Sequence, residues 1–173
     1  PSAELFVNGK SQGVQKKNDS SPQNRYRLMW MDVKYEPGTL RVVAMDEQGN
    51  KVAEREMHTA GAPHHLELSA DREVIKADGN DLSYVTVSVV DKDGNLCPTA
   101  AHDLSFKVNG AGTYRAACNG DATSLQIFHM PTMKAFSGKL VVLVQATDKP
   151  GDIKLEVSGK GLKKGSISIV SER

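Results

Sequence analysis

The sequence predicts an all-β protein made of two tandem, immunoglobulin-like modules, each an antiparallel β-sandwich. Alternation of apolar and polar residues dominates the 173 residues, and no window shows the 3.6-residue period of an amphipathic helix. Clusters of Gly, Pro, Asn and Asp interrupt this alternation at the short intervals that are typical of sandwiches. The content of 39% hydrophobic and 25% charged residues is that of an ordinary globular protein.

Residues 1–60 are expected to form a small sandwich module. Residues 4–7 predict a short strand, and the Asn8-Gly9 dipeptide after it favours a tight type I′ hairpin turn. Residues 25–33 alternate again, which predicts a strand that places Trp30 in the core. Two further strands are expected at residues 40–45 and 51–58.

Residues 61–173 are expected to form the second sandwich. The segment 59–63, Thr-Ala-Gly-Ala-Pro, is short and rich in small residues, and its proline disfavours a helix just before it, so it is the expected linker. Beyond it, about seven strands broken by turns match the pattern of an immunoglobulin-like domain. They lie at residues 65–70, 82–91, 104–109, 113–118, 139–147, 153–158 and 166–170.

Charge and hydropathy exclude two classes of partner. The formal net charge is +1, from 22 basic and 21 acidic side chains, without a long basic cluster, so no nucleic acid is expected. No apolar run approaches the roughly 18 residues of a membrane span, so no membrane partner is expected. The first residues lack the basic and apolar regions of a signal peptide, and we expect the chain to be an excised fragment.

Two motifs raise the question of a metal site. The run Asp91–Asn95 begins like a calcium loop, but its twelfth position is His102 rather than the Glu that completes the coordination. A hairpin turn is the better interpretation. His58, His64 and His65 flank the linker, yet neighbours on an extended backbone point to opposite faces and chelate one ion poorly. We therefore expect neither a metal nor another cofactor.

The residues indicate no catalytic group. Glycoside hydrolysis usually needs two facing carboxylates, whereas Glu54, Glu56 and Glu156 are expected to point to solvent. The nucleophile motif Gly-x-Ser-x-Gly is missing from the sequence. Aromatic residues make up only 5% of the chain, which weakens an alternative interpretation as a carbohydrate-binding module; an exposed Trp30 would favour that alternative.

The segment from Asn119 to Phe136 is the candidate contact surface. It follows a strand, has no clean period, and combines hydrogen-bonding side chains with apolar ones. A connection of this length in a compact domain is often functional or packed against another part, although an ordinary surface loop remains the alternative. The candidate residues for contact with another domain or with an active-site rim are Asn119, Gly120, Asp121, Thr123, Ser124, Met130, Met133 and Phe136.

Five segments resemble one family in the same order. Residues 4–13, ELFVNGKSQG, are similar to a signature near the C-terminus of many family 2 glycoside hydrolases of the β-galactosidase type, which are common in Bacteroides-type bacteria. The resemblance continues along the chain and covers nearly all of it. The further segments are YEPGTL at 35–40, TAGAP at 59–63, ADGNDL at 77–82 and NGDATS at 119–124.

The resemblance implies a non-catalytic role beside an upstream enzyme. In this family a (β/α)₈ barrel carries the two catalytic glutamates and precedes C-terminal β domains. The chain would then buttress that barrel or a subunit interface of the same polypeptide, with no catalytic residue of its own. The parent would be a retaining β-galactosidase, periplasmic or extracellular, and an oligomer is compatible with it. The alternative is an autonomous carbohydrate-binding module with a glycan as partner.

Two details of the chain depart from the family pattern. The family's first module normally starts with one more strand, so we expect an unpaired sheet edge near the start of this chain. Cys97 and Cys118 stand where the family would have small or apolar residues. This favours two free thiols over one disulfide, although the sequence leaves both open.

Overall fold

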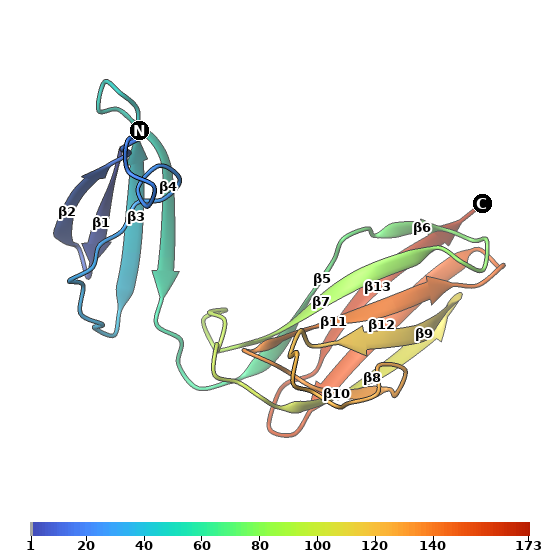
Figure 1. Cartoon of the computed structure of the whole chain (residues 1–173). Coiled ribbons are helices and arrows are strands. Elements are labelled where there is room, and N and C mark those ends of the chain that lie inside the picture. The colour runs from blue at the N-terminus through green and yellow to red at the C-terminus, as the bar shows by residue number, and fades with distance from the viewer. Residues whose placement is uncertain (1) are drawn as a thin grey trace. The chain divides into compact units, whose positions relative to one another are not determined.

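The computed structural model describes residues 2–173, and in these residues it contains thirteen strands joined by turns and loops (Figure 1). The expected all-β fold with antiparallel sheets is confirmed. Contacts divide the chain into two compact units, one ending at Thr59 and the other starting at Ala60. That division falls inside the Thr-Ala-Gly-Ala-Pro segment that the sequence suggests as linker.

The first unit is a single four-stranded antiparallel sheet. Its strands are β1 (Ser2–Val7), β2 (Lys10–Lys16), β3 (Thr39–Met45) and β4 (Lys51–His58), and they lie in the order β2-β1-β3-β4. Asn8 and Gly9 have φ values of 50° and 79°, and positive φ at both positions is what a type I′ turn requires. β1 pairs on both sides, with β2 and β3, so β2 and β4 are the edge strands of this sheet.

The second layer expected for the first module is not formed by its described strands. Residues 25–33, the predicted strand, belong to a long loop between β2 and β3. Tyr26 is 85% exposed, and Trp30 is half-buried with its indole N–H donating to the Gly13 carbonyl oxygen at 2.8 Å. Alternation over a few residues is a weak strand signal. The Arg25 N–H donates to the Ser21 carbonyl oxygen at 3.0 Å, which is a local turn bond rather than a strand pairing.

The second unit consists of two sheets packed face to face. One has the order β10-β8-β12-β13-β6 and the other β5-β7-β11-β9. All pairings are antiparallel except that of β6 with β13. The strands are β5 (His65–Ala70), β6 (Val74–Lys76), β7 (Leu82–Val90), β8 (Asp103–Gly110), β9 (Gly112–Cys118), β10 (Thr132–Lys134), β11 (Lys139–Ala146), β12 (Gly151–Gly159) and β13 (Gly165–Glu172).

The core of the second unit lies between these sheets. Val85, Val87 and Val89 alternate along β7 and are fully buried, and they meet side chains of the opposite sheet in one cluster. That opposite layer includes Leu104 and Leu155, which are also fully buried. The seven strands predicted for this unit form close to the expected residues. The short strands β6 and β10 were not predicted, because three residues carry too little periodicity.

Candidate functional site

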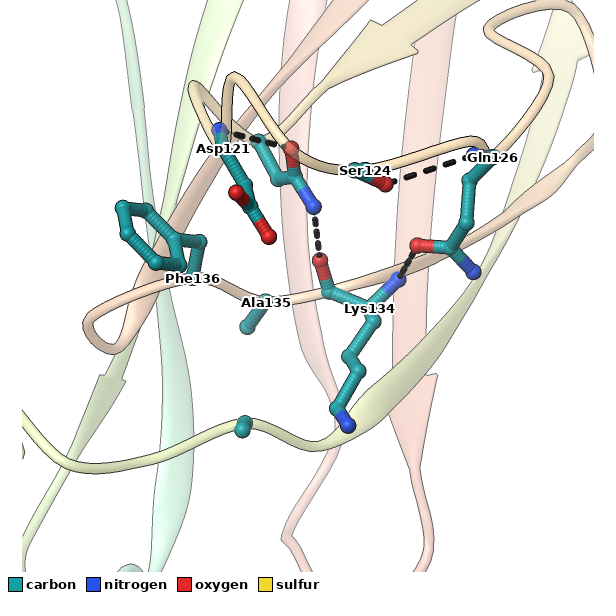
Figure 2. Close-up of a pocket in the computed structure, with 8 residues that line it drawn as sticks. Asp121, Ser124, Gln126, Lys134, Ala135 and Phe136 are labelled. Carbon is teal, nitrogen blue, oxygen red and sulfur yellow. Dashed lines mark hydrogen bonds between the residues drawn. The ribbon is translucent and has the colours of Figure 1, made fainter.

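The segment from Asn119 to Phe136 leaves β9, crosses to the other sheet as β10 and turns into β11. It borders an open hollow of about 270 Å³ (Figure 2). Four of the candidate residues line this hollow, namely Asn119, Asp121, Ser124 and Phe136. The rest of its lining comes from Ala101, Gln126, Lys134 and Ala135, which the sequence did not single out.

The other four candidates have different places. Gly120 has a φ of 77°, and it allows the tight turn after Asn119. Thr123 is exposed and bonds Asp121, and Met130 is 48% exposed. Met133 is only 1% exposed, so it belongs to the core and cannot be a contact residue. It points inward from β10, whereas its neighbour Lys134 is exposed, as alternation along a strand demands.

Two side-chain amides bind the outer edge of β10. Asn119 Nδ2 donates to the Lys134 carbonyl oxygen at 3.0 Å, and the Lys134 N–H donates to Gln126 Oε1 at 2.9 Å (Figure 2). Both backbone groups of Lys134 that point away from β8 are thereby satisfied without another strand. The amides take the place of a neighbouring strand, which covers an edge that would otherwise be open.

Asp121 carries the negative charge of the hollow. Its Oδ1 accepts hydrogen bonds from the Thr123 hydroxyl at 2.7 Å and the Thr123 N–H at 2.9 Å. These two bonds lower the pKa of the Asp121 carboxyl, so the group is ionised at neutral pH. Within residues 2–173 no donor reaches its second oxygen, which therefore stays available as an acceptor.

The tip of the segment is apolar and exposed. Leu125 is 97%, Ile127 56% and Phe128 55% exposed; with Met130 we call these four residues the apolar tip. The Tyr114 hydroxyl lies 2.9 Å from the Phe128 carbonyl oxygen and 2.7 Å from that of Met130, and donates to them. Burial raises the pKa of Tyr114, so this hydroxyl keeps its proton at neutral pH. The tip is thus held in place by the sheet below it.

The Asp91–Asn95 run forms the predicted hairpin turn. The Asp91 carboxylate accepts the N–H groups of Asp93 and Asn95, each at 2.9 Å, and also that of Gly61 in the linker segment at 2.7 Å. The Gly61 bond is the largest of the causes that hold the pKa of Asp91 far below its usual range. Its acceptor sites are occupied by the protein's own backbone, as in an Asx-type turn.

The other titratable clusters are also satisfied internally. His64 and His65 bring their Nδ1 atoms to 3.0 Å, and Glu156 pairs with Lys154 at 3.1 Å. Among residues 2–173, no three His, Cys, Asp or Glu side chains are grouped so that they could hold a metal ion. Cys97 is buried and Cys118 exposed, and both are free thiols.

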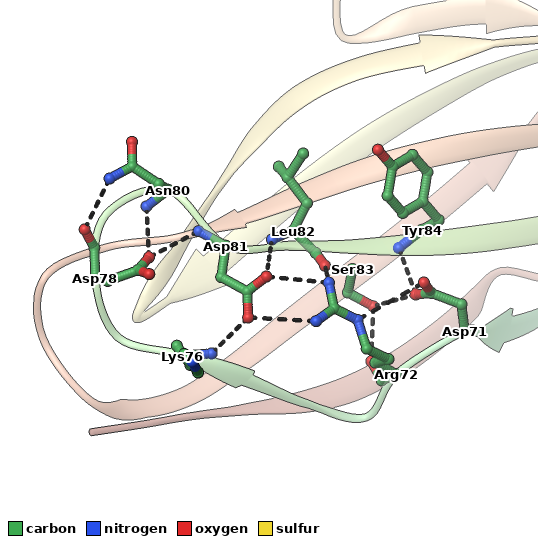
Figure 3. A network of polar contacts seen from close by, with 9 residues as sticks. All are labelled: Asp71, Arg72, Lys76, Asp78, Asn80, Asp81, Leu82, Ser83 and Tyr84. Atoms are coloured by element: carbon green, nitrogen blue, oxygen red, sulfur yellow. Dashed lines mark hydrogen bonds and ion pairs between the residues drawn. The ribbon is translucent and has the colours of Figure 1, made fainter.

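A second polar network fastens β6 to the start of β7 (Figure 3). Asp81 accepts bonds from the Lys76 N–H at 2.8 Å and from Arg72 at 3.0 Å, and Arg72 also donates to the Leu82 carbonyl oxygen. These bonds to Asp81, with that of Lys76 foremost, lower the pKa of its carboxyl. Because its members bond one another, the network explains how a three-residue strand is held in place rather than where a ligand would bind.

Comparison with known proteins places both units in one group of enzymes. Residues 66–168 match the family model described as glycoside hydrolase family 2 C-terminal domain 5, and residues 1–53 match a domain of unknown function, DUF4982. The chain is 44% identical to the β-galactosidase BoGH2A of Bacteroides ovatus, over 98% of its own length and 19% of that protein. It is 30% identical to a β-glucuronidase of Formosa agariphila, over 68% of its length and 12% of that protein.

Solved structures agree with this placement. A family 2 glycosyl hydrolase from Bacteroides cellulosilyticus superimposes with a TM-score of 0.87 at 31% identity, covering 99% of this chain and 22% of that one. The chain spans about a fifth or less of the curated relatives named above. In the part of the chain that the structure describes, no helix is long and apolar enough to cross a membrane.

Proposed function

The chain belongs to glycoside hydrolase family 2, as part of its C-terminal region, and on this premise we propose that it is a non-catalytic accessory pair of domains. Its role is to buttress the catalytic (β/α)₈ barrel of the same polypeptide through the apolar tip. The parent is a retaining glycosidase of the β-galactosidase type. The match of nearly the whole chain to the C-terminal fifth of a β-galactosidase supports this proposal.

The apolar tip is the single observation that carries the docking role. The side chains of Leu125, Ile127 and Phe128 are exposed to solvent, although the unit has a hydrophobic core of its own. Moving one such side chain from water into an apolar contact is worth about 1.5–3 kcal/mol. Exposed apolar residues that gather on one segment mark interaction sites more often than chance exposure does.

The fixed conformation of the segment also supports docking. Tyr114 binds the carbonyl oxygens of Phe128 and Met130, and the Phe106 N–H donates to the Pro131 carbonyl oxygen at 3.0 Å. A surface that is already ordered loses less conformational entropy when it binds. The catalytic part of the same polypeptide is the partner we commit to, because this chain covers only 19–22% of the relatives and the enzyme activity in their names must reside in a polypeptide that extends well beyond it.

The test uses the full-length parent enzyme with Leu125→Ser and Phe128→Ser combined. We expect the variant to unfold several degrees earlier than the wild type and to lose activity on an aryl β-galactoside. The 173-residue chain alone should unfold at the same temperature with and without the changes, because these side chains are exposed in it. Tyr84→Ser, at another exposed aromatic residue, is the matched control and should leave the parent unchanged.

Three results would contradict the proposal. One is a parent enzyme that tolerates the double substitution as well as it tolerates Tyr84→Ser. Another is a parent that keeps its stability and activity when residues 60–173 are deleted. Hydrolysis of the aryl galactoside by the isolated chain would refute the non-catalytic role.

A further inference from the structure

We infer that the hollow beside the apolar tip binds one neutral pyranose ring of an oligosaccharide. This binding goes beyond the proposed docking role and does not depend on it. None of the four tip residues lines the hollow, so the tip can contact another domain while the hollow stays open. The two surfaces belong to one segment but differ in chemistry.

The polar groups of the hollow are suited to sugar hydroxyls. The free oxygen of Asp121 can only accept, while the Nε2 of Gln126 can only donate. The Ser124 oxygen accepts the Gln126 N–H at 3.3 Å and keeps its own proton for another partner. Each hydroxyl of a pyranose both donates and accepts, so neighbouring hydroxyls can satisfy a fixed mixture of this kind.

These polar groups are held in place by bonds that leave their outer atoms free. The Thr123 bonds orient the Asp121 carboxylate through Oδ1 alone. The Lys134 N–H fixes Gln126 through Oε1 and leaves its NH₂ group unpaired within residues 2–173. A site that is ordered before its ligand arrives binds with a smaller entropy loss.

Phe136 supplies the apolar wall. Its side chain is 47% exposed, and in the view of Figure 2 the Asp121 carboxylate lies beside its ring. The Phe136 N–H donates to the Lys139 carbonyl oxygen at 2.9 Å, which fixes the backbone of this tight turn. Ligand sites combine an aromatic surface with a few placed polar groups, and the C–H face of a pyranose fits that combination.

The volume of the hollow and the charge of Asp121 limit which class of sugar can bind. At about 270 Å³ the hollow is smaller than the usual drug-sized pocket of about 300–1,000 Å³, so it has room for one ring. The ionised Asp121 would repel the carboxylate of a uronic acid. Lys134 would attract the same group, but it lies on a flexible exposed chain, whereas Asp121 is half-buried and held by Thr123. A neutral hexose is therefore favoured over an acidic one.

The test is an NMR titration of the isotope-labelled 173-residue chain with methyl β-D-galactopyranoside. We expect saturable, fast-exchange shifts at the Gln126 side-chain amide and at the Phe136 ring, with an affinity in the millimolar range. Phe136→Ala should weaken binding about fivefold or more, the value of an aromatic contact. Asp121→Asn should weaken it as well, and methyl β-D-glucopyranosiduronic acid should bind less tightly than the galactoside.

Leu125→Ala is the matched control, because this residue is on the same segment but outside the hollow. It should leave the titration unchanged even if it weakens docking in the parent enzyme, so the two proposals fail separately. A titration without saturable shifts would overturn the inference. So would shifts that persist unchanged in Phe136→Ala, once the spectrum of that variant shows an intact fold.

Discussion

Asp91 shows how one carboxylate can join two parts of the chain. It is 2% exposed and accepts bonds from the Gly61 N–H of the linker segment as well as from its own turn. The buried Cys97 lies close by, with its thiol 3.6 Å from the Gly61 carbonyl oxygen. This side chain therefore orders the start of the second unit, a role that its position in a turn motif alone does not reveal.

Asp91 also predicts how stability depends on pH. The pKa of its carboxyl is lower in the folded than in the unfolded chain, chiefly because of the Gly61 N–H bond. Its contribution is therefore complete above the ordinary aspartate pKa of about 4 and is lost as the pH falls through the folded value. Urea unfolding between pH 7 and pH 2 should show Asp91→Asn less stable at pH 7 and less sensitive to acid.

Asp93→Asn is the control for this prediction, since Asp93 is in the same turn but its carboxylate pairs with Lys92 at the surface. It should retain the acid sensitivity of the wild type. An Asp91→Asn chain that loses stability with falling pH as steeply as the wild type would show that other carboxyls are responsible.

At the scale of elements, β10 is the unexpected feature. It is three residues long and lies at the edge of a five-stranded sheet. Strand pairing with β8 holds one side of it, and the amides of Asn119 and Gln126 hold the other. A sheet edge that is covered in this way cannot recruit a strand from another molecule.

Removing both amides should open this edge. We expect Asn119→Ala combined with Gln126→Ala to lower the free energy of unfolding by about 1–3 kcal/mol, the sum of two ordinary hydrogen bonds. Chemical denaturation measures this loss, and sedimentation at high protein concentration should reveal self-association. Asn109→Ala removes a longer contact, 3.5 Å, at an exposed position and should have little effect. A double variant as stable and as monomeric as this control would contradict the interpretation.

At the scale of the whole molecule, the two units differ in how much apolar surface they bury. In the described part of the first unit only Ala3 and Val7 belong to the buried hydrophobic residues, while the second unit holds all the others. Each fully buried Val, Leu or Ile contributes about 1.5–3 kcal/mol. A small unit with so few of them is marginal by itself.

Separate expression of the two units should make this difference visible. We expect residues 60–173 to unfold cooperatively in urea, with a midpoint close to that of the same unit in the whole chain. Residues 1–59 should show little cooperative unfolding and a circular dichroism spectrum dominated by unfolded chain. Cooperative unfolding of residues 1–59, with the stability of an ordinary domain, would contradict this expectation.

The sequence was enough to locate the segment that contains the candidate site. It was not enough to tell which residues line the hollow. The length and composition of the Asn119–Phe136 segment were enough to mark it. Composition could not show which methionine of the segment faces water. In the structure Met133 is on the inward side of β10, whereas Met130 is on the exposed tip. Gln126 and Lys134 line the hollow together, and the Lys134 N–H donates to Gln126 Oε1 across the segment. Their spacing in the sequence does not predict this bond.

The sequence by itself determined the all-β class, the Asn8-Gly9 and Asp91–Asn95 turns, the linker segment and most strands of the second unit. These features depend on local backbone preferences and on alternation, which each stretch of sequence carries within itself. Only the tertiary structure decided that Trp30 lies in a loop, that β6 joins its sheet in parallel, and which side chains meet around the hollow. Those outcomes depend on partners far away in the chain, and packing and hydrogen bonding select such partners only once the sheets have formed.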